Sequence, residues 1–452
     1  MTPNVPDRLD ALSRRRAACT PREDEVVSIV PAGVPIPVEG TDASYRFRGH
    51  DHVRHLLGEV HPGDVLVHVP GEPWCLYAPV PGADDAVWHG PTPRPEERAE
   101  RAGLTLGRPL DELAHRVEGA PAVAYAGARD LLERPGAYGL HPEIVGNWRI
   151  DADASAELED RIVGSRLVKD DVALDAMRRA VAASAAGHRA ARAAARAGRT
   201  ERQIARVLEH AFDDAGGEGT AYPSIVLAGR RSQILHGGPD DTEMQDGDLV
   251  LIDAGAEIDG YDADITRTFA VGGVASPETR AVHDVVRRVQ AAVVRLVAPD
   301  VSTRMLHEAA SRGLAEGLVE LGLLRGRVDD LLAADAQTVF FPHGIGHFLG
   351  LATHDVGGYL RGAQRSSRPS LKYLRADRTL QPGMVMTIEP GLYFIDALLD
   401  DPEVRSERRA QVDFERAEAF RHVGGVRIED DVLVTPTGHE VLGADLERDL
   451  GV

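Results

Sequence analysis

Short apolar segments bounded by Gly and Pro alternate with longer, periodic segments in the first third of the chain. This pattern predicts strands that alternate with helices, which is typical of a small α/β domain. The predicted strands are residues 26–30, 65–69, 74–77 and 122–125. The predicted helices are residues 93–103 and 109–117, after a polar helix or arm over residues 1–22. The closely spaced Asp51, His52 and His55 predict a solvated turn and no catalytic constellation.

Longer amphipathic helices and paired strands follow a polar, acidic stretch at residues 140–165. A chain of 452 residues rarely folds around a single core, so we predict two domains, 1–155 and 156–452. The helices of the second domain are predicted from an Ala/Arg-rich pattern and from cap residues. One helix is predicted over residues 171–198, and three more begin after Thr200, Ser276 and Ser302. The predicted strands are 249–253, 261–271, 384–389 and 426–435, which makes this domain α+β.

The turn sequence Asp259-Gly260 sets which residues of two of these strands face each other. If these two residues form the turn, the pairing places Asp253 opposite Thr266. Asp264 then lies diagonally from Asp253 on the same face, roughly 7–8 Å away at the backbone. Two carboxylates directed at one point repel each other unless a cation lies between them, which favours a metal site. The alternative is a shifted register that leaves one of them in solvent.

Two further carboxylates lie inside apolar strands. Glu389 ends the segment Val385-Met386-Thr387-Ile388, and Glu429 precedes an apolar stretch at 432–434. An unpaired charge at such a position is costly, so each carboxylate needs a partner. Arg427 could supply one as a buried ion pair, and a metal ion is the other interpretation.

Three histidines lie within twelve residues of one Gly-rich segment: His343, His347 and His354. Pro342 and the glycines exclude a regular helix there, so a loop of solvated histidines is the alternative to a site. Four carboxylates with one or two imidazoles suit a centre of two divalent metal ions. Hard oxygen ligands favour Mn²⁺, with Co²⁺ or Zn²⁺ as alternatives.

Charge and cysteine content narrow the class of protein. The chain has 72 acidic and 51 basic residues and a net charge of −21, which disfavours nucleic acid and anionic membranes as partners. The two cysteines, Cys19 and Cys75, cannot form a disulfide framework and fit a reducing compartment. The N-terminus has no apolar core of a signal peptide, and no apolar run could span a bilayer. We therefore expect a soluble cytoplasmic protein.

The candidate ligands follow one another in a characteristic order. They are Asp253, Asp264, His347, Glu389 and Glu429. This series resembles the five metal ligands of the pita-bread metallopeptidases, which include methionine aminopeptidase, aminopeptidase P and prolidase. The flanking sequences DITRT, PHGIGH and LQPGM…TIEPG resemble the Xaa-Pro branch of that family. The resemblance covers about residues 140–445, and it implies a pita-bread catalytic domain after a smaller α/β domain that matches only weakly.

Two long segments favour prolidase within this branch. One lies between His354 and Gln381 and carries Arg375, and the other lies between residues 396 and 424. His236 matches a family histidine that is usually followed by tyrosine, whereas Gly237 follows it here. This departure leaves the shape of the pocket near His236 open.

The resemblance implies hydrolysis of Xaa-Pro dipeptides through a water that bridges two divalent cations. Asp253 would ligate one cation and His347 the other, while Asp264 and Glu429 would bridge them. Glu389 would carry a proton from the water to the proline nitrogen.

The resemblance also implies roles for residues around the ligands. His354 would stabilise the oxyanion, His343 would contact the substrate carbonyl or the proline carboxylate, and His236 would line the proline pocket. Arg375 would pair with the free carboxylate of a dipeptide. Thr266 and Arg427 would lie behind the ligands, and for Arg427 a structural ion pair is the alternative.

Two other functions stay open. An Xaa-Pro aminopeptidase would take longer peptides with proline at the second position, and a metal-free homologue would be a binding protein. Retention of all five ligands disfavours the binding protein. A homodimer is expected from the resemblance alone.

Overall fold

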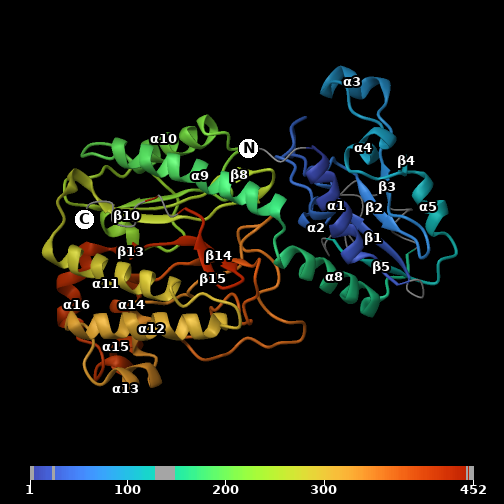
Figure 1. The fold of residues 1–452 in the computed structure, drawn as a ribbon. Helices are drawn as coiled ribbons and strands as arrows, with labels where there is room; N and C mark the ends of the chain where they lie inside the picture. The colour runs from blue at the N-terminus through green and yellow to red at the C-terminus, as the bar shows by residue number, and fades with distance from the viewer. Residues whose placement is uncertain (1–4, 23–25, 128–147, 444–445, 447–452) are drawn as a thin grey trace. The chain divides into compact units, whose positions relative to one another are not determined.

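The computed structural model describes residues 5–22, 26–127, 148–443 and 446, which fall into two compact units. The units are Met1–Arg166 and Leu167–Val452 (Figure 1). The predicted boundary at 155/156 lies inside helix α8 (Ala152–Leu167). No helix in the described ranges is long and apolar enough to cross a membrane.

The first unit is built on a mixed five-stranded sheet with the order β4-β3-β2-β1-β5. Its central pairs β1–β2 and β2–β3 are antiparallel, and the outer pairs β1–β5 and β3–β4 are parallel. The strands are β1 (Val27–Pro31), β2 (Val65–His68), β3 (Cys75–Ala78), β4 (Gly107–Pro109) and β5 (Val123–Tyr125). The helices are α1 (Val5–Cys19), α2 (Asp51–Leu57), α3 (Ala83–His89), α4 (Pro95–Arg101), α5 (Glu112–Val117) and α8. All four predicted strands of this region are confirmed.

Helix α2 lies where the sequence predicted a solvated turn, and that prediction is wrong. The apolar residues Val53, Leu56 and Leu57 are buried in the core of the unit and hold the helix against it. His52 and His55 are three positions apart, so they share the inward face, and they are only 5% and 4% exposed. The Nε2 atom of His55 lies 2.8 Å from Ser165 Oγ, and Arg166 Nη1 lies 3.0 Å from His52 Nδ1, so both are core histidines with polar partners.

The second unit places its long helices in two pairs on either side of its strands, as Figure 1 shows. One pair packs on β6, β7 and β10, and the other packs on β11, β13 and β14. The pairs are α9 (Asp171–Ala194) with α10 (Glu201–Asp214), and α11 (Pro277–Val294) with α12 (Thr303–Glu320). Thr200, Ser276 and Ser302 accept hydrogen bonds as N-caps, as predicted. Shorter elements are α13 (Val328–Ala333), α14 (Asp396–Leu399), α15 (Pro402–Arg408), α16 (Phe414–Phe420), η2 (Gly229–Gln233), η3 (Val271–Gly273), η4 (Ala336–Val339) and η5 (Arg421–Val423).

The strands of this unit form small antiparallel sheets. One has the order β10-β7-β6 and another β11-β14-β15, and β8–β9 and β12–β13 are two-stranded. The first sheet contains β6 (Ile225–Ala228), β7 (Leu249–Asp253) and β10 (Thr266–Ala270). The second contains β11 (Val385–Ile388), β14 (Asp430–Thr435) and β15 (Gly438–Val441). The pairs are β8 (Glu257–Ile258) with β9 (Tyr261–Asp262), and β12 (Gly391–Tyr393) with β13 (Gly425–Arg427).

The predicted hairpin register is confirmed, but two predicted strands are broken. Ile258 pairs with Tyr261, and Asp253 pairs with Thr266. The strand predicted over 261–271 is interrupted between β9 and β10, and the strand predicted over 426–435 is interrupted between β13 and β14. Asp264 and Glu429 lie in these interruptions, where the backbone leaves the regular ladder. The Glu429 N–H donates to Thr266 O (3.1 Å), which joins the break at Glu429 to the start of β10.

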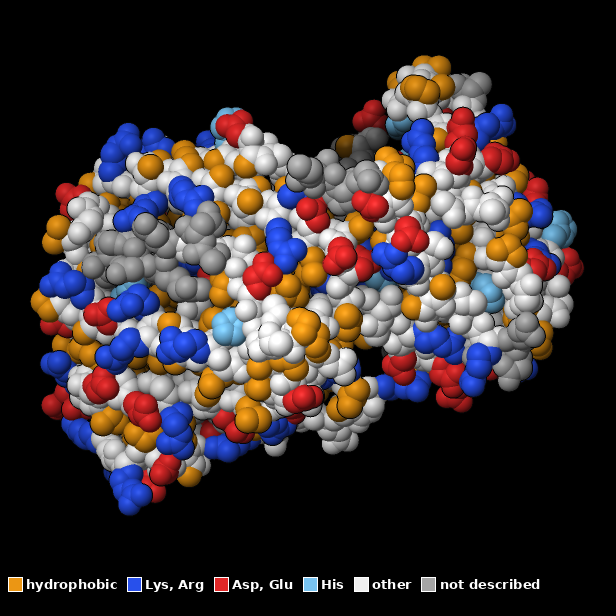
Figure 2. Space-filling view, viewed as in Figure 1, with side chains coloured by type: hydrophobic (Ala, Val, Ile, Leu, Met, Phe, Trp, Pro, Cys, Tyr) orange, Lys and Arg blue, Asp and Glu red, His pale blue; other side chains and the backbone are white. Residues whose placement is uncertain are grey.

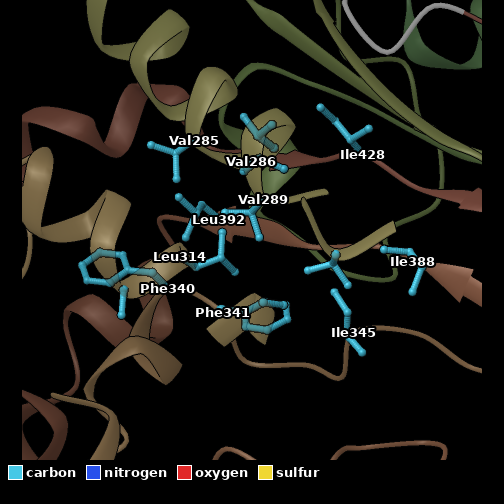
Figure 3. Close-up of a cluster of buried hydrophobic side chains, with 14 of the residues drawn as sticks. Val285, Val286, Val289, Leu314, Phe340, Phe341, Ile345, Ile388, Leu392 and Ile428 are labelled. Carbon is cyan, nitrogen blue, oxygen red and sulfur yellow. The ribbon is translucent and has the colours of Figure 1, made fainter. Parts of the chain in front are cut away.

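A hydrophobic cluster lies directly behind the segments that carry the candidate residues. Figure 3 shows Ile345, Ile388 and Ile428 directed into this cluster with Val289 and Leu314 of α11 and α12. Ile388 and Ile428 each precede a glutamate in the chain. Because successive side chains of extended backbone point to opposite faces, burying the isoleucines directs Glu389 and Glu429 away from the core.

Candidate metal and catalytic site

Asp253 and Asp264 are brought together by the hairpin and share one hydrogen-bond partner. The Tyr222 hydroxyl donates to Asp253 Oδ1 (2.6 Å) and also contacts Asp264 Oδ1. A hydroxyl carries one proton, so the second contact needs a proton on the carboxyl group. Burial raises the pKa of Asp264 well above its ordinary value, and Asp253 and Asp431 add to the shift. Without a cation, Asp264 is therefore held as a neutral carboxyl group, and its ionised form needs a compensating positive charge.

His347 is held in the tautomer that leaves Nε2 open. Its Nδ1 lies 3.0 Å from the Phe348 carbonyl oxygen, which can only accept, so Nδ1 carries the proton. Nε2 lies 3.3 Å from Asp264 Oδ2 and 3.8 Å from Glu389 Oε1. Burial lowers the pKa of His347, so the ring is neutral with a free lone pair among carboxylates.

Glu429 is fixed by side chains of β10. The Thr266 hydroxyl donates to Glu429 Oε2 (2.6 Å), and Arg267 Nη1 donates to the Glu429 carbonyl oxygen (2.7 Å). Burial raises the pKa of Glu429 well above its ordinary value, with Asp264 and Glu389 adding to it. One ligand-type atom each from Asp264, His347 and Glu429 lies within 4.8 Å of the others, a spacing that could hold a metal ion.

Glu389 lies directly after β11, beside His343. Its N–H donates to Ile345 O (2.8 Å), and its Oε2 lies 3.6 Å from His343 Nδ1. Burial raises the pKa of Glu389, an effect that His347 opposes. The carboxyl group is thus near both histidines of the PHGIGH segment.

Both ring nitrogens of His343 have partners. Nδ1 lies 2.8 Å from Gly344 O, and Nε2 lies 3.0 Å from the Tyr393 hydroxyl. Arg427 Nη1 donates to the same hydroxyl (2.8 Å). Burial lowers the pKa of His343 to about 3, and Arg427 adds to the shift, so the ring is neutral at pH 7.

Arg427 connects the carboxylates to this group. Its Nη2 lies 2.5 Å from Asp253 Oδ2, and its Nε donates to Thr266 Oγ1 (3.2 Å). It therefore reaches Asp253 directly and Glu429 only through Thr266. The guanidinium is 5% exposed, so it is a fixed charge in the site.

The donor set fits divalent cations. Asp253, Asp264, Glu389 and Glu429 supply hard oxygen atoms, and His347 supplies one neutral nitrogen. The raised pKa values of Asp264, Glu389 and Glu429 are caused first by burial, and repulsion by neighbouring acids, Asp253 in all three cases, adds to the shift. A bound cation removes that repulsion because it attracts the charged form of each carboxyl group.

His354, Arg375 and His236 are exposed side chains near this cluster. The rings of His354 and His347 are perpendicular, with centroids 4.5 Å apart. Although the residue is exposed on one side, partial desolvation of the ring lowers the pKa of His354 to about 3, and His347, Arg375 and His236 add to the shift. The backbone of Arg375 lies close to Gly358, where a Cβ atom would be 2.2 Å from Arg375 O.

Tyr222 and Asp431 are among the site residues that the sequence did not predict, as are Tyr393 and Arg267. Tyr222 precedes a proline in the loop before β6, and nothing local in that loop indicates a contact with Asp253. Asp431 Oδ2 accepts a hydrogen bond from the Asp264 N–H (3.1 Å). Its position in the run Glu429-Asp430-Asp431 was a signal, because three adjacent acids in an apolar strand need separate partners.

A buried cluster of carboxylates around an open imidazole nitrogen, carried on an α+β unit, defines a metal-dependent hydrolase. The chain belongs to metallopeptidase family M24, whose model matches residues 175–436. The model of the aminopeptidase P N-terminal domain matches residues 12–123. The predicted resemblance to the Xaa-Pro branch and the pita-bread fold are confirmed by these matches and by the relatives described next.

The relatives include both dipeptidases and aminopeptidases. Xaa-Pro dipeptidase of Homo sapiens is 33% identical over 455 residues, which cover 98% of this chain and 92% of the human protein. A probable Xaa-Pro aminopeptidase of Verticillium alfalfae is 35% identical over 374 residues, which cover 81% and 78%. The solved aminopeptidase PepP of Pseudomonas aeruginosa is 32% identical with a TM-score of 0.81, covering 97% of this chain and 96% of that one.

Proposed function

We propose that the protein is an Xaa-Pro dipeptidase that hydrolyses dipeptides with proline at the second position. Asp253, Asp264, His347, Glu389 and Glu429 would hold two divalent cations, with Mn²⁺ as the native metal. When bound, the cations lower the pKa of water and polarise the substrate carbonyl, which supplies the nucleophile at neutral pH. We also propose that the protein acts in the cytoplasm as a homodimer.

The side chains around the cations have separate roles in this proposal. Glu389 takes the proton of the attacking water and delivers it to the proline nitrogen, and burial raises its pKa, which favours uptake of a proton. The neutral His354 donates a hydrogen bond to the developing oxyanion. His343 contacts the substrate carbonyl or the proline carboxylate, and His236 lines the proline pocket.

The position of Arg375 is the observation that supports dipeptides, and not longer peptides, as the proposed substrates. Its side chain is exposed, and its charge contributes to the pKa shifts of His347, His354 and Glu389, so it lies at the open side of the site. A guanidinium pairs with a carboxylate through two parallel hydrogen bonds. A dipeptide presents its carboxylate directly after proline, whereas a longer peptide continues with an amide.

We expect Arg375→Ala to weaken cleavage of Gly-Pro selectively. Loss of a hydrogen bond to a charged group costs about 1.5–3 kcal/mol, or roughly 10–150-fold in kcat/KM. The measurement is steady-state hydrolysis of Gly-Pro and of Gly-Pro-Pro by metal-stripped enzyme reloaded with Mn²⁺. Arg365→Ala, which removes an exposed arginine of the same segment, is the matched control.

Three results would distinguish the functions. Preferential cleavage of Gly-Pro, restored by Mn²⁺ and lost in Arg375→Ala, supports the dipeptidase. Faster cleavage of Gly-Pro-Pro supports an Xaa-Pro aminopeptidase, the activity for which several relatives are named. No cleavage of either peptide and no bound metal would overturn both proposals in favour of a binding protein.

A further inference from the structure

A buried ion pair involves Asp355, the residue that directly follows His354. Lys169 Nζ lies 3.2 Å from Asp355 Oδ2, and each side chain is 1% exposed. The two residues are 186 positions apart, so the pair joins the start of the second unit to the loop that carries His354. The Lys169 N–H donates to Gly383 O (2.8 Å), which fixes the lysine backbone before α9 begins.

The loop from His347 to Asp355 is closed by its own backbone. The Asp355 N–H donates to Phe348 O (2.9 Å), which brings the two ends of the loop together. His347 precedes one end and His354 precedes the other, so this closure sets the 4.5 Å separation of their rings. The geometry of His354 therefore depends on where Asp355 is held.

Both neighbours of His354 are anchored by polar partners. The Thr353 hydroxyl donates to Asp262 Oδ2 (2.9 Å), and Asp355 is paired with Lys169. The exposed His354 lies between these two anchors.

The ion pair also packs tightly against the loop backbone. A Cβ atom at Gly350 would lie 2.2 Å from Asp355 Oδ2 and 3.0 Å from Lys169 Cε. The Gly350 carbonyl accepts a hydrogen bond from the Asp262 N–H (2.8 Å). The pair thus has little freedom to move without displacing the loop.

We propose that Lys169 is a positioning residue that sets the orientation of His354 through Asp355. The proposal rests on the proposed function in one respect, because its effect on catalysis requires that His354 contacts the substrate. Its effect on the environment of His354 does not depend on the reaction.

The kinetic test uses the full chain loaded with Mn²⁺ and a double-mutant cycle. We expect Lys169→Met to lower kcat for Gly-Pro by about 10- to 100-fold and to change KM much less, because a misplaced group loses alignment with the reacting atoms. In a His354→Ala background the same substitution should change kcat less than about two-fold, because the residue through which it acts is already absent. An equal loss in both backgrounds would overturn the proposal.

Two further variants separate positioning from the cost of an unpaired buried charge. The double variant Lys169→Met with Asp355→Asn removes both charges of this ion pair together. We expect it to recover thermal stability without recovering kcat. Arg98→Met is the matched control, since it breaks the buried Arg98–Asp64 pair (2.8 Å) of the first unit and should leave kcat unchanged.

NMR of the metal-free chain labelled with ¹³C-histidine tests the proposal without any activity. The His354 signal is assigned by its loss in His354→Ala, and the buried His307 serves as the internal reference. We expect Lys169→Met, or the double variant if the single one does not fold, to shift the His354 signal and to leave His307 in place. An unchanged His354 signal in a folded variant would overturn the proposal. If wild-type enzyme fails to cleave Gly-Pro but the signal shifts, the proposed function fails and the positioning role stands.

Discussion

The half-buried His343 and the buried His347 lie beside the same glutamate, yet their ring nitrogens have different surroundings. Each ring donates from Nδ1 to a backbone carbonyl, of Gly344 and Phe348 respectively. The second nitrogen of His343 is then occupied by the Tyr393 hydroxyl, whereas that of His347 faces carboxylates. Of these two rings, only that of His347 is therefore prepared to donate a lone pair to a cation.

Glu389→Gln tests the proton-transfer role. The amide keeps the shape of the side chain but cannot accept a proton, so we expect kcat for Gly-Pro to fall by about 10²–10⁴-fold. Metal content measured on the same sample separates lost chemistry from lost binding. Glu316→Gln, on the exposed face of α12, is the control. Activity within a few-fold of wild type would exclude Glu389 as the proton carrier.

His307 makes the stability of the second unit depend on pH. Burial lowers its pKa to about 4, while its Nε2 lies 2.7 Å from Ser370 O. In the unfolded chain His307 takes up a proton near pH 6.5, whereas in the folded chain it stays neutral until about pH 4. The contribution of His307 to stability is therefore complete above pH 6.5 and is lost as the pH falls toward 4. A shift of this size corresponds to about 3 kcal/mol.

Urea unfolding at pH 7.5 and pH 5 checks this expectation. His307→Gln can still donate to Ser370 O but does not titrate, so its midpoint should fall less between the two pH values than that of wild type. An identical fall in both proteins would assign the acid sensitivity to other groups.

At the scale of elements, local signals predicted the hairpin but not the strand breaks. Asp259 and Gly260 both have positive φ (50° and 77°), so the turn residues themselves set the register that places Asp253 opposite Thr266. The breaks at Asp264 and Glu429 depend on pairing between strands far apart in sequence, which hydrophobic alternation does not encode. Helix α2 was missed because its histidines were taken as polar, although Ser165 satisfies one of them in the core.

The segment before His347 requires glycine at position 346. A Cβ atom there would lie 1.9 Å from Thr387 O, the backbone of β11. We expect Gly346→Ala to lower the free energy of unfolding by about 2–4 kcal/mol and to reduce metal binding, because His347 must move with the backbone. Gly438→Ala is the matched control, since a Cβ at that position meets nothing within 4 Å. Urea midpoints and bound Mn²⁺ measure both effects, and equal midpoints would contradict the expectation.

At the scale of the whole molecule, the acidic excess is partly concentrated inside the second unit. Figure 2 shows basic and acidic side chains interspersed over the visible described surface. The buried acids of the site, in contrast, gather around one imidazole and one guanidinium, Arg427. Metal binding should therefore contribute to the stability of the fold as well as to catalysis.

Metal removal tests this contribution. At a free Mn²⁺ concentration 100 times Kd, one site adds about 2.7 kcal/mol, which corresponds to roughly 5 °C in Tm. We expect chelation to lower Tm by at least this amount, and Mn²⁺ to restore it. The paired substitution Asp264→Asn with Glu429→Gln should abolish the response, and a response that persists would place the stabilising cation elsewhere.

The chain has only two lysines, and they lie in opposite environments. Lys169 is enclosed in its ion pair, whereas Lys372 is exposed, with Nζ 4.6 Å from the centre of the Tyr373 ring. Both cysteines are buried as well. An amine-directed fluorophore on the folded protein thus reaches one lysine side chain, three positions before Arg375. Lys372 thus offers, besides the α-amino group of the chain, a native attachment point for an optical reporter near the proposed carboxylate-binding arginine.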